Sequence, residues 1–152
     1  MEPAMRAIFA TSLLLTAVPL FAAAQEPGKV AREKLVGVWN GYAVEGKGEK
    51  PDQGAVKLEL TISPELIKAK QFKGEEVLDL GEGTFEIVLD KSPNYLDGNK
   101  KTANPKRQEV WLGIYQLEGD TLKWCVGRKA RPAEFETKEG AFLLILKRKS
   151  HE

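Results

Sequence analysis

The residue types that carry most enzyme chemistry are scarce in this chain. Its 152 residues include one histidine, His151, next to the C-terminal residue, and one cysteine, Cys125. A serine or cysteine nucleophile needs a neighbouring base, usually histidine, and transition-metal sites need clustered histidines, thiolates or carboxylates. Because the body of the chain offers neither set, we expect no metal, no cofactor and no catalytic residues.

Two patterns of acidic residues are also weak evidence for a catalytic or metal site. Asp120, Glu134 and Glu136 could in principle supply a carboxylate pair for glycoside chemistry, but no spacing singles out a pair. The segment Asp97-Gly98-Asn99 is similar to the start of a calcium loop, yet the later acidic ligands are missing. A tight turn is therefore expected at this segment.

Three aromatic residues, Trp111, Tyr115 and Trp124, are the best candidates for a ligand-binding wall. The runs 110–117 and 121–127 predict a hairpin, and a loop of either two or four residues places Tyr115 opposite Trp124. All three aromatic side chains then share one face. Such side chains line many ligand cavities, but they can equally fill the interior of an eight-stranded barrel. Both interpretations stay open at this point.

The elements that position these side chains are short strands. Alternation of apolar and polar residues is clearest over 56–62, and turn residues, Gly81 and Gly83 among them, bound the other runs. A strand near Tyr95 followed by a long loop is expected within 91–107, and a last strand over 141–147. Residues 25–34 suit a short helix or turn. About eight strands without a long helix predict an all-β antiparallel meander, forming a barrel or a sandwich.

The N-terminal segment has the pattern of a signal peptide. An apolar stretch over residues 7–21 is followed by Ala22-Ala23-Ala24, the small residues that signal peptidase reads. We predict cleavage after Ala24, export to the periplasm or the extracellular space, and no stable membrane anchor afterwards. Residues 25–152 then form one β-barrel domain, which a single cysteine cannot cross-link internally.

Charge and surface patterning bear on the partners. Lys and Arg number 23 against 22 Asp and Glu, a net charge of +1, which does not indicate a nucleic-acid-binding protein. The run 141–146 is apolar on both faces, and Leu112 and Ile114 lie on the face opposite the aromatic residues. This second apolar face favours a protein partner or a homo-oligomer.

Several stretches resemble an uncharacterised exported domain family that is abundant in planctomycete bacteria. They are GIYQLEGDTLKWC at 113–125, Arg131-Pro132, Phe135, LLILKR at 143–148 and the opening LVGVWNGYAVEGKG at 35–48. The resemblance implies an exported domain without an established activity, and it supplies no catalytic residues.

Gly37-Val38-Trp39, together with Arg148 on the last strand, is similar to the lipocalin-like pattern. That pattern implies a small barrel in which the tryptophan closes one end and a basic side chain packs across the indole. The leading hypothesis is thus an exported, non-enzymatic binding module for a small apolar or amphipathic ligand. The alternative is a structural or protein-interaction module with a filled barrel and no small-molecule ligand.

Overall fold

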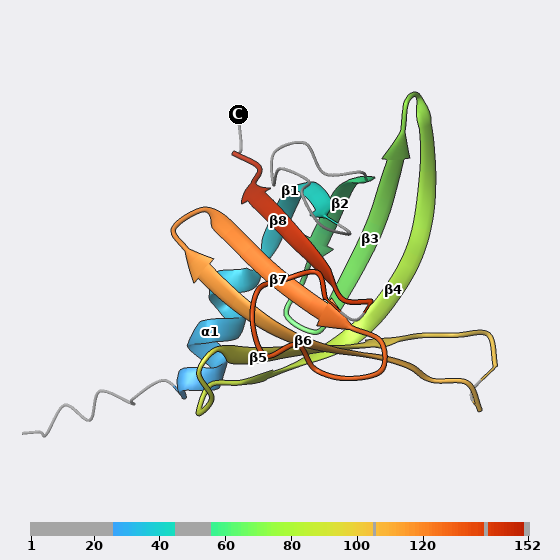
Figure 1. The fold of residues 1–152 in the computed structure, drawn as a ribbon. Coiled ribbons are helices and arrows are strands. Elements are labelled where there is room, and N and C mark those ends of the chain that lie inside the picture. Colours follow the sequence, from blue (N-terminus) through green and yellow to red (C-terminus); the bar gives the residue numbers. More distant parts are fainter. Residues whose placement is uncertain (1–25, 45–55, 105, 139, 151–152) are drawn as a thin grey trace, which may run out of the picture.

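The computed structural model describes residues 26–44, 56–104, 106–138 and 140–150. Within these ranges each strand pairs antiparallel with the next along the chain, and the last strand pairs with the first, so the sheet closes into a barrel (Figure 1). The elements are α1 (Pro27–Leu35), β1 (Gly37–Val44), β2 (Val56–Ile62), β3 (Leu66–Lys73), β4 (Glu76–Val88), β5 (Asn94–Lys100), β6 (Glu109–Glu118), β7 (Thr121–Gly127) and β8 (Phe142–Arg148). The predicted all-β meander is confirmed, as a barrel.

The two-residue alternation of the strands builds the core. On β2, Leu58, Leu60 and Ile62 are buried in the barrel, whereas the residues between them are more exposed. Between β6 and β7, Tyr115 pairs with Trp124 as predicted, across a two-residue turn. The first turn residue, Gly119, has a φ of 55°, a conformation that glycine adopts without steric cost.

Asp97-Gly98-Asn99 was predicted to be a tight turn, and this prediction is wrong, because the segment lies within β5. The Asp97 carboxylate accepts a hydrogen bond from the Gly113 amide of β6 at 3.0 Å and forms an ion pair with Arg131. Gly98 lies close to the Trp124 ring of β7. These contacts between distant residues outweigh the local preference of Asp-Gly for turns.

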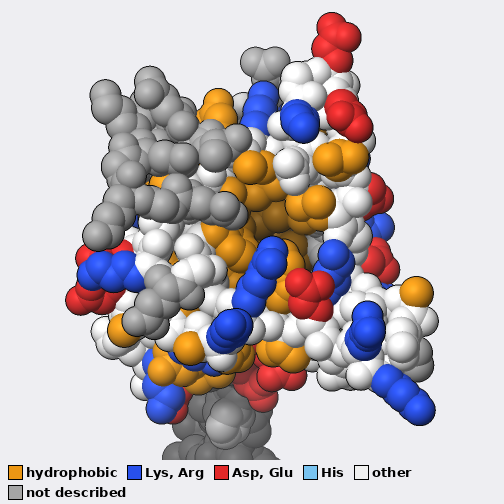
Figure 2. Space-filling view, turned by 45° about the vertical axis from the view of Figure 1, so that its right-hand side comes forward, with side chains coloured by type: hydrophobic (Ala, Val, Ile, Leu, Met, Phe, Trp, Pro, Cys, Tyr) orange, Lys and Arg blue, Asp and Glu red, His pale blue; other side chains and the backbone are white. Residues whose placement is uncertain are grey.

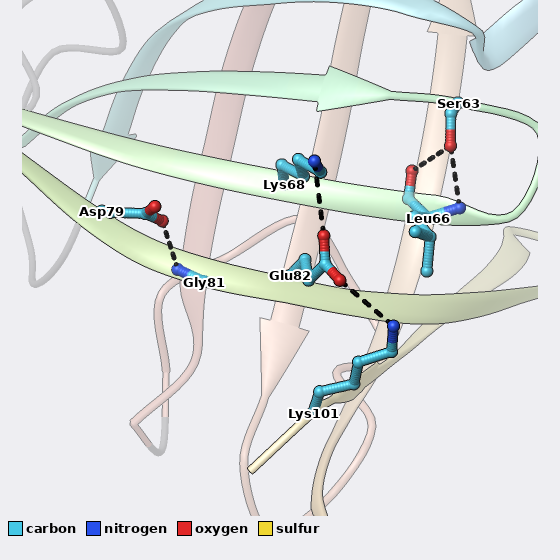
Figure 3. A network of polar contacts seen from close by, with 7 residues as sticks. All are labelled: Ser63, Leu66, Lys68, Asp79, Gly81, Glu82 and Lys101. Carbon is cyan, nitrogen blue, oxygen red and sulfur yellow. Dashed lines mark hydrogen bonds and ion pairs between the residues drawn. The ribbon is translucent and has the colours of Figure 1, made fainter. Parts of the chain in front are cut away.

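Strand β4 is longer than predicted, because Gly81 and Gly83 do not end it. The register against β3 shifts between Ala69 and Lys70, so that Leu80 is an extra residue in β4. Next to this β-bulge the Asp79 carboxylate accepts a hydrogen bond from the Gly81 amide at 2.8 Å (Figure 3). The bulge lets Leu80 pack against the core while Gly81 takes a φ of 90°.

One end of the barrel is closed by α1 and by Trp39. The Trp39 side chain is fully buried, and its indole Nε1 donates a hydrogen bond to the carbonyl of Leu35 at 2.8 Å. The Arg148 guanidinium carbon lies 4.2 Å from the ring centroid of Trp39. The two terminal nitrogens of Arg148 donate hydrogen bonds to the carbonyls of Lys34 and Val36 at 2.6 Å each. The predicted closure by Trp39 and Arg148 is confirmed.

A second, smaller apolar cluster lies on the outer face of the sheet. Ile114, Cys125 and Ala141 are buried there, with Phe135 of the connection between β7 and β8 packed against them. Arg131 of the same connection stacks on the Tyr95 ring, with its guanidinium carbon 3.7 Å from the ring centroid. The chain thus covers part of its own outer apolar face.

The predicted signal peptide, residues 1–24, lies outside the described residues. No helix in the described ranges is long and apolar enough to span a membrane.

Candidate ligand-binding cavity

A cavity of about 310 Å³ lies inside the barrel. Figure 2 shows it as a hollow with hydrophobic walls and charged side chains around its mouth. Its apolar wall residues come from most of the strands: Ala43, Val56, Leu58, Leu60, Ile67, Ala69, Leu80, Trp111, Trp124, Phe142 and Leu144. The barrel is therefore filled around Trp39 and hollow towards the other end.

Small residues on the cavity wall create this space. Ala43, Ala69, Gly81, Gly83 and Gly98 all line the cavity, where larger side chains would fill it. Gly83 is required for a second reason, because a Cβ there would lie 2.4 Å from the carbonyl oxygen of Asn99 on β5. A Cβ on Gly98 would meet Trp124 at 3.6 Å, an ordinary van der Waals contact.

Of the three aromatic residues predicted to bind a ligand, Trp111 and Trp124 line the cavity. Tyr115 is 5% exposed and belongs to the barrel core, outside the cavity lining. Burial raises the pKa of the Tyr115 hydroxyl. Contact between a ligand and these three residues stays a prediction.

Trp124 is held in a fixed position at the cavity wall. Its Nε1 donates a hydrogen bond to the Leu96 carbonyl at 2.9 Å. Gly113 makes room for this indole, since a Cβ on residue 113 would lie 2.2 Å from the Trp124 Nε1. This role of Gly113 was not predicted from the sequence, although a glycine inside a strand often marks such a close approach.

Trp111 is less constrained than Trp124. Its ring packs edge-on against Phe142, with the centroids 5.4 Å apart and the planes at 84°. The buried Nε1 of Trp111 has no hydrogen-bond partner among the described residues, whereas Trp39 and Trp124 both donate to carbonyl groups. Ring packing thus holds Trp111 without a polar tether.

Four charged residues line the mouth of the cavity, namely Glu82, Lys100, Glu109 and Arg128. Glu82 is already paired: its carboxylate oxygens lie 3.1 Å from the Lys101 ammonium nitrogen and 3.4 Å from that of Lys68 (Figure 3). The hydrogen bond from Lys101 is the main cause that lowers the pKa of Glu82. Glu82 is thus held ionised, contrary to what a general acid requires.

The described residues contain no group of three or more His, Cys, Asp or Glu side chains that could hold a metal ion. The Cys125 thiol is fully buried in the outer cluster, away from the cavity lining, and burial raises its pKa. A raised pKa keeps a thiol protonated and weakly nucleophilic. The site therefore offers an apolar space with a charged mouth.

No protein-family model, no curated protein and no solved structure matches the chain.

Proposed function

We propose that this protein is an exported, non-enzymatic binding module that takes a small apolar or amphipathic molecule into its barrel. The observation that carries the proposal is the cavity of about 310 Å³, which is walled mainly by aliphatic and aromatic side chains. Ligand pockets of proteins usually have volumes of 300 Å³ or more, apolar walls and a few polar groups. Export is inferred from the apolar stretch and the alanine triplet at the N-terminus.

The physical basis of binding would be removal of apolar surface from water. A guest gains roughly 25 cal/mol for each Å² of apolar surface that it buries, less the cost of its lost freedom of motion. Because the closed end is filled by Trp39 and its neighbours, the guest can enter only to the depth of Leu60 and Ile67. Compact molecules or single short chains fit this space better than bulky ring systems.

The test is a titration of purified protein with a panel of short-chain alcohols, fatty acids and small aromatic molecules, followed by tryptophan emission. Trp111 and Trp124 line the cavity, so a saturable change in emission is expected for at least one class of molecule. Trp124→Phe should reduce the signal change and keep the fold. A folded protein without a saturable response to any probe would contradict the proposal.

One observation favours the second candidate, a protein-interaction module. Val77 and Leu78, at the β3–β4 hairpin, are 53% and 39% exposed, more than is usual for large apolar side chains. Sedimentation of the wild type and of Val77→Ser/Leu78→Ser at increasing concentration would test self-association. Concentration-dependent dimers in the wild type alone would support the interaction module.

A further inference from the structure

We propose that the guest of this cavity carries an anionic head group, a carboxylate or a phosphate, and that Lys100 and Arg128 hold this group at the mouth. The inference rests on the proposed binding function and specifies the chemical class of the ligand. Both basic residues line the cavity.

The strand alternation directs Lys100 into the barrel, and Arg128 lies just beyond an inward-facing series on β7. On β5, Leu96 and Gly98 face inward, and Lys100 is next in the same two-residue series. On β7, Trp124 and Val126 face inward, and Arg128 follows them directly after the strand. The tail of an amphiphile in contact with Trp124 would therefore place its head group near both cations.

The Lys100 side chain also crosses the mouth towards the neighbouring strand. Its Cε lies 3.6 Å from the point where a Cβ of residue 81 would stand. The absence of a side chain on Gly81 leaves this path free. The apolar stem of Lys100 thus extends the cavity wall beside β4. Lysines at apolar boundaries typically keep their ammonium group in water.

The charge balance at the mouth leaves these cations available. Glu82 is neutralised by Lys68 and Lys101. Glu109 stands opposite Lys100 in the β5–β6 register, but no ion pair joins them. Within the described part of the chain, neither Lys100 nor Arg128 forms an ion pair with another described residue. With Glu82 paired to lysines outside the lining, Lys100 and Arg128 face only Glu109, an excess of one positive charge.

The decisive experiment compares the affinities of charged and neutral guests that have the same alkyl chain. Decanoate, decyl phosphate, decanol and decyltrimethylammonium should be titrated into the wild-type protein below their micelle concentrations, by calorimetry. We expect the two anions to bind roughly tenfold more tightly than decanol, and the cation to bind more weakly than decanol. Raised salt should weaken binding of the anions and leave decanol unchanged. The relative affinities of decanoate and decyl phosphate distinguish a carboxylate from a phosphate ligand.

Two double variants, each losing two positive charges, distinguish an effect of the cations at the mouth from an effect of the protein's net charge. Lys100→Gln/Arg128→Gln should abolish the advantage of the anions and bind decanol as the wild type does. Lys70→Gln/Lys129→Gln, whose residues do not line the cavity, should keep the advantage.

Equal affinity for decanol and the anions, or an unchanged preference in Lys100→Gln/Arg128→Gln, would overturn the head-group assignment while the binding function stands. Tighter binding of the cation would overturn it too and point to Glu109. Absence of binding by all four probes would overturn the head-group assignment, and the fluorescence panel, which also contains compact aromatic molecules, then decides on the binding function.

Discussion

At the scale of single residues, Trp39 and Arg148 connect the N-terminal helix to the closed end of the barrel. The indole fills the end of the core and donates to Leu35, the last residue of α1. Arg148 lies across the ring and joins the last turn of α1 and Val36 to the end of β8. This contact was expected from the similarity of Gly37-Val38-Trp39 and Arg148 to the lipocalin-like pattern.

Replacing Trp39 with alanine should lower the free energy of unfolding by about 3–5 kcal/mol, because transfer energy is lost and a cavity remains. Trp39→Phe, which keeps an aromatic ring but loses the hydrogen bond to Leu35 and part of the buried ring surface, should cost less. Denaturant unfolding followed by circular dichroism measures both variants. A loss below about 1 kcal/mol in Trp39→Ala would contradict the role assigned to this residue.

The buried thiol of Cys125 predicts a pH dependence of stability. Burial raises its pKa in the folded protein, so the unfolded chain releases this proton first as the pH rises. The unfolded state then binds fewer protons than the folded state, and the free energy of unfolding falls above about pH 8.5. Chemical unfolding between pH 7 and pH 10 should show this decline, and Cys125→Ala should show a smaller one. An equal decline in both proteins would assign the effect to other groups, of which Tyr115 is one.

At the scale of elements, β4 and β5 form the part of the cavity wall whose small residues leave the interior space empty. Gly83 on β4 pairs with Lys100 on β5, and Gly81 and Gly98 line the cavity beside this pair. A β-bulge at Leu80 and a close approach of the two backbones at Gly83 shape this wall.

The two glycines Gly83 and Gly98 should respond differently to the same substitution. Gly83→Ala forces a Cβ against the Asn99 carbonyl and should destabilise the protein by roughly 1–3 kcal/mol. Gly98→Ala meets Trp124 at an ordinary contact distance and should be nearly neutral, since alanine also suits a strand better than glycine. Thermal unfolding of the pair checks this, and equal losses would contradict the geometry of the wall.

The sequence patterns predicted the strands wherever alternation was regular, as on β2 and on the β6–β7 hairpin. They failed at glycines, because Gly81, Gly83 and Gly98 carry the local signature of turns. Their actual role, to give space to a neighbouring backbone or ring, depends on residues far away in the chain. For the same reason the aromatic face of β6 and β7 was predictable, whereas the size of the cavity beside it was not.

At the scale of the whole molecule, the barrel is divided into a filled half and a hollow half. A completely filled barrel interior would stabilise the fold most, and the half around Trp39 and Leu122 is packed in this way. The hollow half has small residues where larger ones would add buried surface. Forgone packing of this kind is expected where a site serves binding.

The N-terminal segment yields a separate prediction for the whole chain. After expression in an exporting host, intact-mass measurement should find a mature chain that begins at Gln25, because the alanine triplet precedes it. Ala24→Arg should slow the cleavage or move it to another position. A mature protein that retains residues 1–24 would contradict the proposed export.

The most direct test of the binding proposal fills the cavity from within. Ala69→Phe places a ring in the hollow half, whereas Lys70→Phe adds the same ring at the exposed neighbouring position on β3. Affinity for the tightest-binding probe of the fluorescence panel should be measured by calorimetry for both variants and for the wild type, after circular dichroism has shown that each is folded. We predict that Ala69→Phe loses at least tenfold in affinity and that Lys70→Phe binds as the wild type does. Undiminished binding by a folded Ala69→Phe would show that the guest lies outside the barrel and would contradict the proposal.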